Sequence, residues 1–185
     1  MLYNDNFLDE EYIKKLQNVF YEDANSFFPW IIESHNFKSG AFVLTHKAII
    51  DKTIVSPLSD ESKKILSNFC YEKMIKLEDI VDSEAQLYIF GADSLEVSLE
   101  KYAPKEDQFL FLYFVNQSNS NFKITSDGST NEEILSSKSG RGALIKNGDK
   151  VFLSSSSSNE FQAILLVLFT GHVPEFVLSD RVILN

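Results

Sequence analysis

Two stretches near the start of the chain place their hydrophobic residues at helical spacing. The first follows Asp9, a residue type suited to an N-cap, and its apolar face comprises Tyr12, Ile13, Leu16, Val19 and Phe20. The second follows Ser56 and Pro57, a typical helix start, and its apolar stripe comprises Ile65, Leu66, Phe69 and Cys70. The pattern predicts a helix over roughly residues 9 to 21 and another beginning near residue 57.

Elsewhere the pattern changes to short runs rich in β-branched and aromatic residues. One run, 41–50, lies between the helices and leads into a turn at Asp51 and Lys52. From about Glu84 onward seven more runs read as strands: 86–90, 95–99, 109–116, 122–125, 142–146, 150–153 and 162–169. Turns carrying glycine separate several of them. Many short strands of this kind favour an antiparallel barrel or jelly roll, with the two helices packed against one face.

The length and composition fit one mostly β, α+β domain with a sizeable core. The chain has 185 residues, of which 44% are hydrophobic and 16 are Phe. We expect residues 1–83 to give helical support with one or more strands, 84–172 to form the core roll and 173–185 to extend beyond it. That extension carries six large apolar residues: Phe176, Val177, Leu178, Val182, Ile183 and Leu184. They could dock onto a neighbouring chain by strand addition, although we favour packing on the domain itself.

The acidic balance of the chain limits its partners. Lys and Arg number 17 against 27 Asp and Glu, a formal net charge of −10, whereas binding to phosphates needs a basic face. We therefore expect no nucleic-acid partner. The longest apolar run, 163–169, is too short to cross a bilayer, and the N-terminus lacks the pattern of a signal peptide. We expect no membrane partner, and the single cysteine fits a reducing compartment.

Few residues suggest catalysis. The three histidines, His35, His46 and His172, have no partner at metal-ligand spacing; His46 reads as a hydrogen-bonded histidine on an apolar strand and His172 as a turn residue. Cys70 lies on the apolar stripe of a helix, where cysteine acts as a small hydrophobe. The serine run 154–158 reads as a solvated loop, and the adjacent pair Glu132 and Glu133 as a solvated turn.

Taken in order, several segments resemble those of one enzyme family. These are Asn6-Phe-Leu-Asp-Glu-Glu, Phe27-Phe-Pro-Trp30, Phe42-Val-Leu-Thr-His46, the helix and strand up to Phe90, and Leu112-Tyr-Phe-Val-Asn116. The sequence resembles prolyl-hydroxylase-like 2-oxoglutarate/Fe(II) dioxygenases, particularly the short versions encoded by marine tailed bacteriophages. The resemblance implies a double-stranded β-helix, two facing antiparallel sheets that form a jelly roll, with helices at the N-terminal side.

The same resemblance implies which residues should bind iron and oxoglutarate. Active relatives hold iron with a His-x-Asp near the start of the roll and a second His near its end, and bind oxoglutarate with an Arg on the last strand. By alignment Ser98 and Glu100 take the places of the His-x-Asp, Val151 that of the second His, and Gln162 that of the Arg. No histidine occurs between His46 and His172. Membership of this family would therefore make the chain a pseudoenzyme that has lost its metal triad.

Three functions remain open at this point. We favour a catalytically inactive jelly roll that acts as a structural or protein-interaction component, with no cofactor, in a bacteriophage virion or the host cytoplasm. Its partners would be other virion proteins or copies of itself. A second possibility is an active hydroxylase with an unusual ligand set of His46, Glu100 and His172. A third is a small-molecule-binding jelly roll whose old pocket is lined by Ser98, Glu100, Tyr113 and Gln162.

Overall fold

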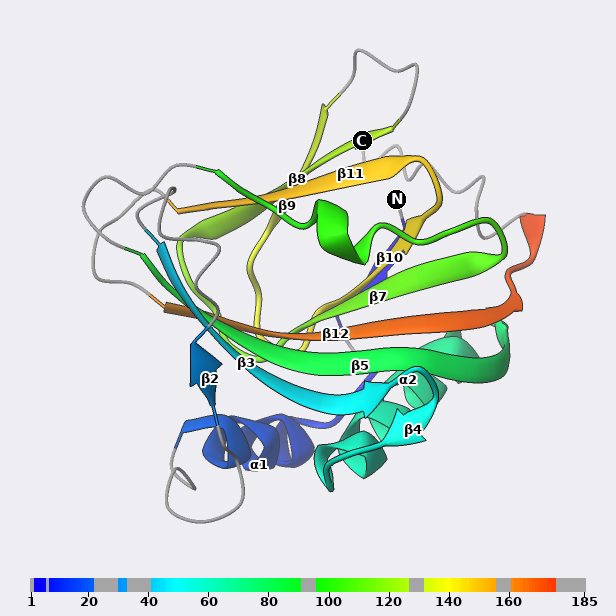
Figure 1. Ribbon diagram of the computed structural model, residues 1–185, viewed down its shortest axis with the longest axis horizontal. Coiled ribbons are helices and arrows are strands. Elements are labelled where there is room, and N and C mark those ends of the chain that lie inside the picture. Colours follow the sequence, from blue (N-terminus) through cyan, green and yellow to red (C-terminus); the bar gives the residue numbers. More distant parts are fainter. Residues whose placement is uncertain are drawn as a thin grey trace.

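Two antiparallel β-sheets face each other, and helices cover the outer face of the larger sheet (Figure 1). The structure is a computed structural model, and it describes residues 2–5, 7–21, 30–32, 41–90, 96–126, 132–155 and 161–175. From residue 76 onward the strands alternate largely between the two sheets, so that each layer is built from segments distant in sequence. This is a double-stranded β-helix, and the jelly-roll prediction is confirmed.

The element bounds are as follows. Along the larger sheet the order is β1 (Leu2–Asn4), β10 (Gly142–Lys146), β7 (Gln108–Phe114), β12 (Phe161–His172), β5 (Lys76–Phe90), β3 (Ala41–Ile50) and β2 (Ile31–Ile32), with β4 (Thr53–Ile54) paired to β3. Along the smaller sheet it is β6 (Val97–Ser98), β11 (Asp149–Ser155), β8 (Ser120–Ser126) and β9 (Glu132–Ser136). The helices are α1 (Glu10–Tyr21), α2 (Leu58–Glu72) and a 3₁₀ turn, Glu100–Tyr102.

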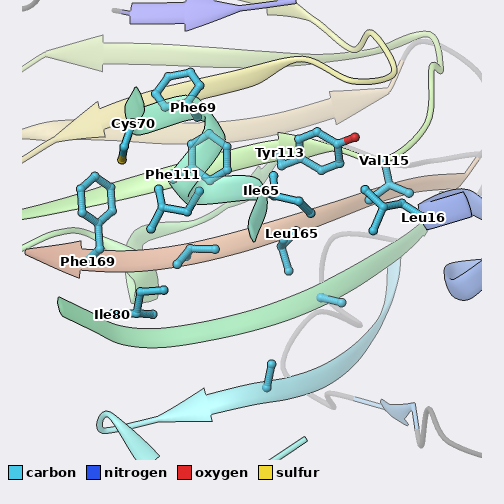
Figure 2. Packing of buried hydrophobic residues seen from close by; sticks show 14 of the residues in the cluster. Leu16, Ile65, Phe69, Cys70, Ile80, Phe111, Tyr113, Val115, Leu165 and Phe169 are labelled. Atoms are coloured by element: carbon cyan, nitrogen blue, oxygen red, sulfur yellow. The ribbon is translucent and has the colours of Figure 1, made fainter. Parts of the chain in front are cut away.

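The larger sheet separates two hydrophobic cores. Because successive side chains on a strand point to opposite faces, its central strands contribute to both. Phe111 and Leu165 pack with the helices, in the helix-side core that Figure 2 shows. Leu112 and Leu166 point the other way, into the inter-sheet core between the two sheets. The two cores fix which face of each strand a residue occupies, and this decides where a site can lie.

Both predicted helices are confirmed. The backbone N of Tyr12 donates to Asp9 Oδ1 at 2.7 Å, so Asp9 is the N-cap that the sequence suggested. The apolar stripe of α2 is buried in the helix-side core throughout. The turn at Asp51 and Lys52 is also confirmed, since both residues have positive φ angles of 46° and 66° and join β3 to β4.

Three predictions about strands need correction, and the strand β1 was not predicted. β5 begins at Lys76, so the expected boundary at residue 84 falls inside a strand; three acidic residues in its first half obscured the pattern. Glu132 and Glu133 lie on the edge strand β9, whose residues are mostly exposed, and not in a turn. Ser154 and Ser155 extend β11, while the rest of the serine run lies outside the described residues. The short strand β1 had no sequence signal.

Asp5 ties the segment after β1 to the start of β10. Its carboxylate accepts hydrogen bonds from Arg141 Nη2 at 2.9 Å and Lys138 Nζ at 3.0 Å. The Arg141 hydrogen bond, followed by Lys138, holds the pKa of Asp5 below its usual value. The folded state therefore favours the charged carboxylate, and this stabilisation is present above the unfolded pKa and lost as pH falls through the lowered folded pKa.

We expect Asp5→Asn to lower the free energy of unfolding by about 1 kcal/mol at neutral pH. The difference between wild type and variant should begin to shrink below about pH 4, where the carboxyl of the unfolded chain becomes neutral, and should be lost as the pH falls through the lowered pKa of the folded state. Urea unfolding at neutral pH and at about pH 3 measures both values. A difference that does not change with pH would show that Asp5 contributes nothing through its charge.

The described helices are all too short or too polar to cross a membrane.

Candidate functional site

The inter-sheet space beside the paired strands β6 and β11 is lined by apolar side chains. Val97 and Leu153 are register partners, and the backbone N of Leu99 donates to Val151 O at 2.9 Å. All four side chains are buried, each no more than 4% exposed, and all belong to the inter-sheet core. The prediction that Val151 faces this interior agrees with its placement. Its surroundings, however, are hydrophobic on every strand that reaches it.

Ser98 does not line the interior. It pairs with Phe152 on the outer face of the smaller sheet and is exposed. Neighbouring residues on a strand face opposite ways, so a shift of one position replaces Ser98 by Val97 or Leu99. The prediction that Ser98 belongs to a vestigial pocket is therefore wrong. Glu100 lies in the 3₁₀ turn that follows β6, and its side chain is outside the described part of the chain.

Tyr113 also faces away from the inter-sheet space. It lies in the helix-side core (Figure 2). Its ring centroid is 6.0 Å from that of Phe7. Its hydroxyl has no hydrogen-bond partner in the described residues, and burial raises the pKa of this phenol. The prediction that Tyr113 lines the old pocket is wrong, because its strand is apolar on both faces and the sequence cannot tell which side a residue takes.

Gln162 does point into the inter-sheet space, but its amide is already bonded. It is fully buried. Its Oε1 accepts from Ser118 Oγ at 2.6 Å and from Ser137 Oγ, and its Nε2 donates to Asn116 Oδ1 at 3.0 Å and to Ala163 O at 3.0 Å. A neutral side chain with its donors and acceptors satisfied cannot replace an arginine that binds a carboxylate.

The unusual ligand set fails on distance. His46 is buried on the helix side, where its Nε2 lies 2.6 Å from Ser56 Oγ, so the expected hydrogen-bonded histidine is confirmed. Through the register of β3, β5 and β12 it lies level with Leu165, seven residues from His172. At the rise of a strand this separates the two histidines by about 20 Å, far beyond a shared metal. His172 is exposed and is the last residue of β12, so the prediction that it is a turn residue is wrong.

Among the described residues, no group of three His, Cys, Asp or Glu side chains could hold a metal ion. Iron of the dioxygenase type needs imidazole and carboxylate ligands. The interior positions around Val151 offer only hydrocarbon, so the residues present do not fit the metal. No reaction step through iron can be derived for them.

Cys70 is no better placed for chemistry. It is 2% exposed in the helix-side core, and burial raises the pKa of its thiol to about 12. We expect a thiol reagent such as 5,5′-dithiobis(2-nitrobenzoate) to leave native protein unlabelled and to react fully once urea unfolds it. Absorbance at completion measures both states. Rapid labelling of the native protein would place Cys70 at the surface.

A polar cluster that the sequence reading missed lies inside the roll. Glu84, Gln86 and Tyr88 occupy one face of β5 and are 8% exposed or less. The Tyr88 hydroxyl donates to Gln86, and Gln86 Nε2 and the Tyr102 hydroxyl both donate to Glu84 Oε1. The cluster adjoins a cavity of about 300 Å³ at the mouth of the roll. The alternation Glu84-x-Gln86-x-Tyr88 within a strand was the available signal, but the predicted strand began at residue 86.

Comparison with known proteins gives the fold and not a family. No protein-family model and no curated protein matches the sequence. Among solved structures, the chain is similar to an oxidoreductase of the 2OG-Fe(II) oxygenase family from Burkholderia pseudomallei, with a TM-score of 0.63, 11% identity, and 90% of this chain and 82% of that one covered.

Two further structures show the same likeness. A prolyl-4-hydroxylase from Pseudomonas putida has a TM-score of 0.56 at 13% identity, covering 92% of this chain and 91% of that one. A prolyl hydroxylase from Trichoplax adhaerens, solved with a hypoxia-inducible-factor peptide, has a TM-score of 0.54 at 15% identity, covering 97% and 86%. The chain therefore has the jelly-roll fold of the 2-oxoglutarate oxygenases. At this identity the likeness says nothing of activity.

Proposed function

We propose that the chain is a non-catalytic, dioxygenase-like jelly roll that acts as a structural or protein-interaction component. One observation carries the proposal: the interior positions nearest the expected metal site are Val97, Leu99, Val151 and Leu153. Two neutral imidazoles and a carboxylate are the chemistry that this enzyme class requires. Four buried hydrocarbon side chains supply none of it.

The oxoglutarate side of the site supports the same conclusion. The alignment gives the carboxylate-binding arginine position to Gln162, whose Oε1 accepts from Ser118 and Ser137. A charge-assisted, two-point pair with a carboxylate needs a guanidinium. These positions therefore offer 2-oxoglutarate neither an iron ion nor an arginine to bind its carboxylate.

A surface feature supports a protein partner. Phe42, Ile89 and Phe161 are cross-strand neighbours on β3, β5 and β12, and they form an apolar row on the outer face of the larger sheet. Their exposed fractions are 49%, 39% and 45%. Large apolar side chains clustered on a surface are typical of protein interfaces. We propose that this row contacts a second protein, either a copy of this chain or another component of the same assembly.

The bacteriophage setting rests on the sequence resemblance to short versions of the family in tailed phages. In that setting the chain is a virion component. The six apolar residues of the C-terminal extension, Phe176, Val177, Leu178, Val182, Ile183 and Leu184, lie outside the described residues and stay a prediction.

A thermal-shift assay tests the absence of catalysis. The protein is heated with Mn(II), with 2-oxoglutarate and with both, beside an active prolyl-4-hydroxylase as positive control. We expect the control to rise in Tm with both ligands and this protein to keep its Tm unchanged, because ligand that does not bind the folded state cannot stabilise it. A rise that needs both ligands together would overturn the proposal.

The interface is tested by replacing the outer aromatic residues. In the double variant Phe42→Ser/Phe161→Ser we expect loss of self-association or of capture of purified assembly components, with the Tm of the monomer nearly unchanged. A matched variant truncated after His172 separates the row from the extension. If the double variant assembles like wild type, the row is not the interface.

A further inference from the structure

The cavity at the mouth of the roll has an apolar floor and a charged rim. Leu110, Leu166 and Leu168 form the floor, on the inner face of β7 and β12. Its volume of about 300 Å³ is at the small end of ligand sites, which fits a molecule of amino-acid size. Its lining includes neither Val151 nor Gln162, and it contains Lys101 and Tyr102, which directly follow the aligned acidic position Glu100.

Glu84 supplies an acidic group to the cavity lining, and hydrogen bonds fix its position. It is 8% exposed, and both Gln86 Nε2 and the Tyr102 hydroxyl donate to its Oε1. Burying a carboxylate costs free energy, and apolar residues of similar volume usually stabilise an interior as well or better. Leu110, Leu166 and Leu168 make the floor beside it apolar, yet this carboxylate lies where the interior opens to the cavity. Stability alone does not account for it.

Lys47 is the basic side. It lies directly opposite Glu84 in the register of β3 and β5, on the same side of the sheet. It is exposed, and no ion pair joins it to another described residue. The rim also contains Asp82, whose Oδ1 accepts from the backbone N of Asp51 at 3.0 Å, and Lys101, whose Nζ lies 4.6 Å from the centroid of the Tyr102 ring.

The rim therefore carries two acidic and two basic side chains above a leucine floor. A simple anion in the cavity would be repelled by Glu84 and Asp82 as well as attracted by the lysines. A simple cation would likewise be repelled by Lys47 and Lys101 as well as attracted by the carboxylates. A zwitterion satisfies both signs at once, and an aliphatic side chain covers the floor. We propose that the cavity binds a small aliphatic α-amino acid, with Lys47 on its carboxylate and Glu84 with Tyr102 on its ammonium group.

Three related probes test this proposal on the full chain. L-Leucine is titrated into ¹⁵N-labelled protein by NMR, beside 4-methylpentanoate, which lacks the ammonium group, and 3-methylbutylamine, which lacks the carboxylate. We expect saturable shifts with leucine at residues of β3, β5 and the 3₁₀ turn. Each analogue should bind at least about tenfold more weakly, since each loses one charged contact. No binding of leucine, or equal binding of either analogue, overturns the proposal.

Variants locate the site. Glu84→Gln keeps the shape and removes the charge, and Lys47→Met changes an exposed residue that folding does not need. Both variants should bind leucine at least about tenfold more weakly than wild type. Lys146→Met, an exposed lysine absent from the cavity lining, makes the same change in net charge as Lys47→Met and should bind like wild type. If Lys47→Met and Lys146→Met bind equally well, the site is not in this cavity.

Discussion

Leu99→Asp should lower the free energy of unfolding by about 4 kcal/mol or more, enough to unfold many domains of this size. The substitution copies the family's acidic ligand at an interior position of the roll. Leu99 is 3% exposed in the inter-sheet core, beside Val97 and Val151. A carboxylate there has only hydrocarbon around it, so the cost combines lost packing with a buried unpaired charge. Urea unfolding followed by circular dichroism measures the loss.

Ser98→Asp is the matched control. It makes the same change of charge one residue away, on the exposed outer face of β6. We expect a change within about 0.5 kcal/mol, as for other surface substitutions. The pair therefore tests which face each residue occupies. A severe effect of Ser98→Asp together with a mild effect of Leu99→Asp would show that the alignment, and not the structure, places Ser98 correctly.

Gln162→Arg should also be strongly destabilising, by about 3 kcal/mol, although it introduces the residue type that 2-oxoglutarate dioxygenases use at the aligned position. Gln162 is fully buried, and an arginine there removes the acceptor of Ser118 and Ser137. It also buries a guanidinium, and the side chains that bond Gln162, those of Ser118, Ser137 and Asn116, are all neutral. We expect no gain of 2-oxoglutarate binding, because the positions aligned with the metal site, around Val151, stay apolar. Thermal unfolding with and without 2-oxoglutarate measures both effects.

Phe161→Arg serves as the control for this variant. Phe161 precedes Gln162 on β12 but faces outward and is 45% exposed. The same positive charge should cost less than about 1 kcal/mol there. If Gln162→Arg were as stable as Phe161→Arg and raised its Tm with 2-oxoglutarate, an open cofactor pocket would have to exist beside β12.

The parts of the fold that local physics decides could be predicted from the sequence. The Asp9 cap, the apolar stripe of α2 and the turn at Asp51 and Lys52 depend on neighbouring residues, and all three are confirmed. The start of β5 and the edge strand β9 could not be predicted. Their acidic residues are tolerated because partner strands supply the hydrogen bonds and hydrophobic contacts that the segments lack by themselves.

The site was harder to predict, for two different reasons. The alternation of Val97, Ser98 and Leu99 already indicates which residues face inward, but alignment to a soft motif selected Ser98. Tyr113 lies in a run that is apolar throughout, on a strand buried on both faces, and such a run carries no information about direction. The polar cluster of Glu84 and Tyr102 joins a strand to a turn about 18 residues later, and only the fold brings the two together.

The central claim is that this jelly roll does not bind iron, and a metal stoichiometry tests it most directly. Protein incubated anaerobically with Fe(II) and 2-oxoglutarate, then freed of unbound metal on a desalting column, is assayed for iron by mass spectrometry beside an active prolyl-4-hydroxylase. The apolar interior around Val97, Leu99 and Val151 predicts iron at background level in this protein and about one iron per chain in the control. Close to one iron per chain in this protein would contradict the account.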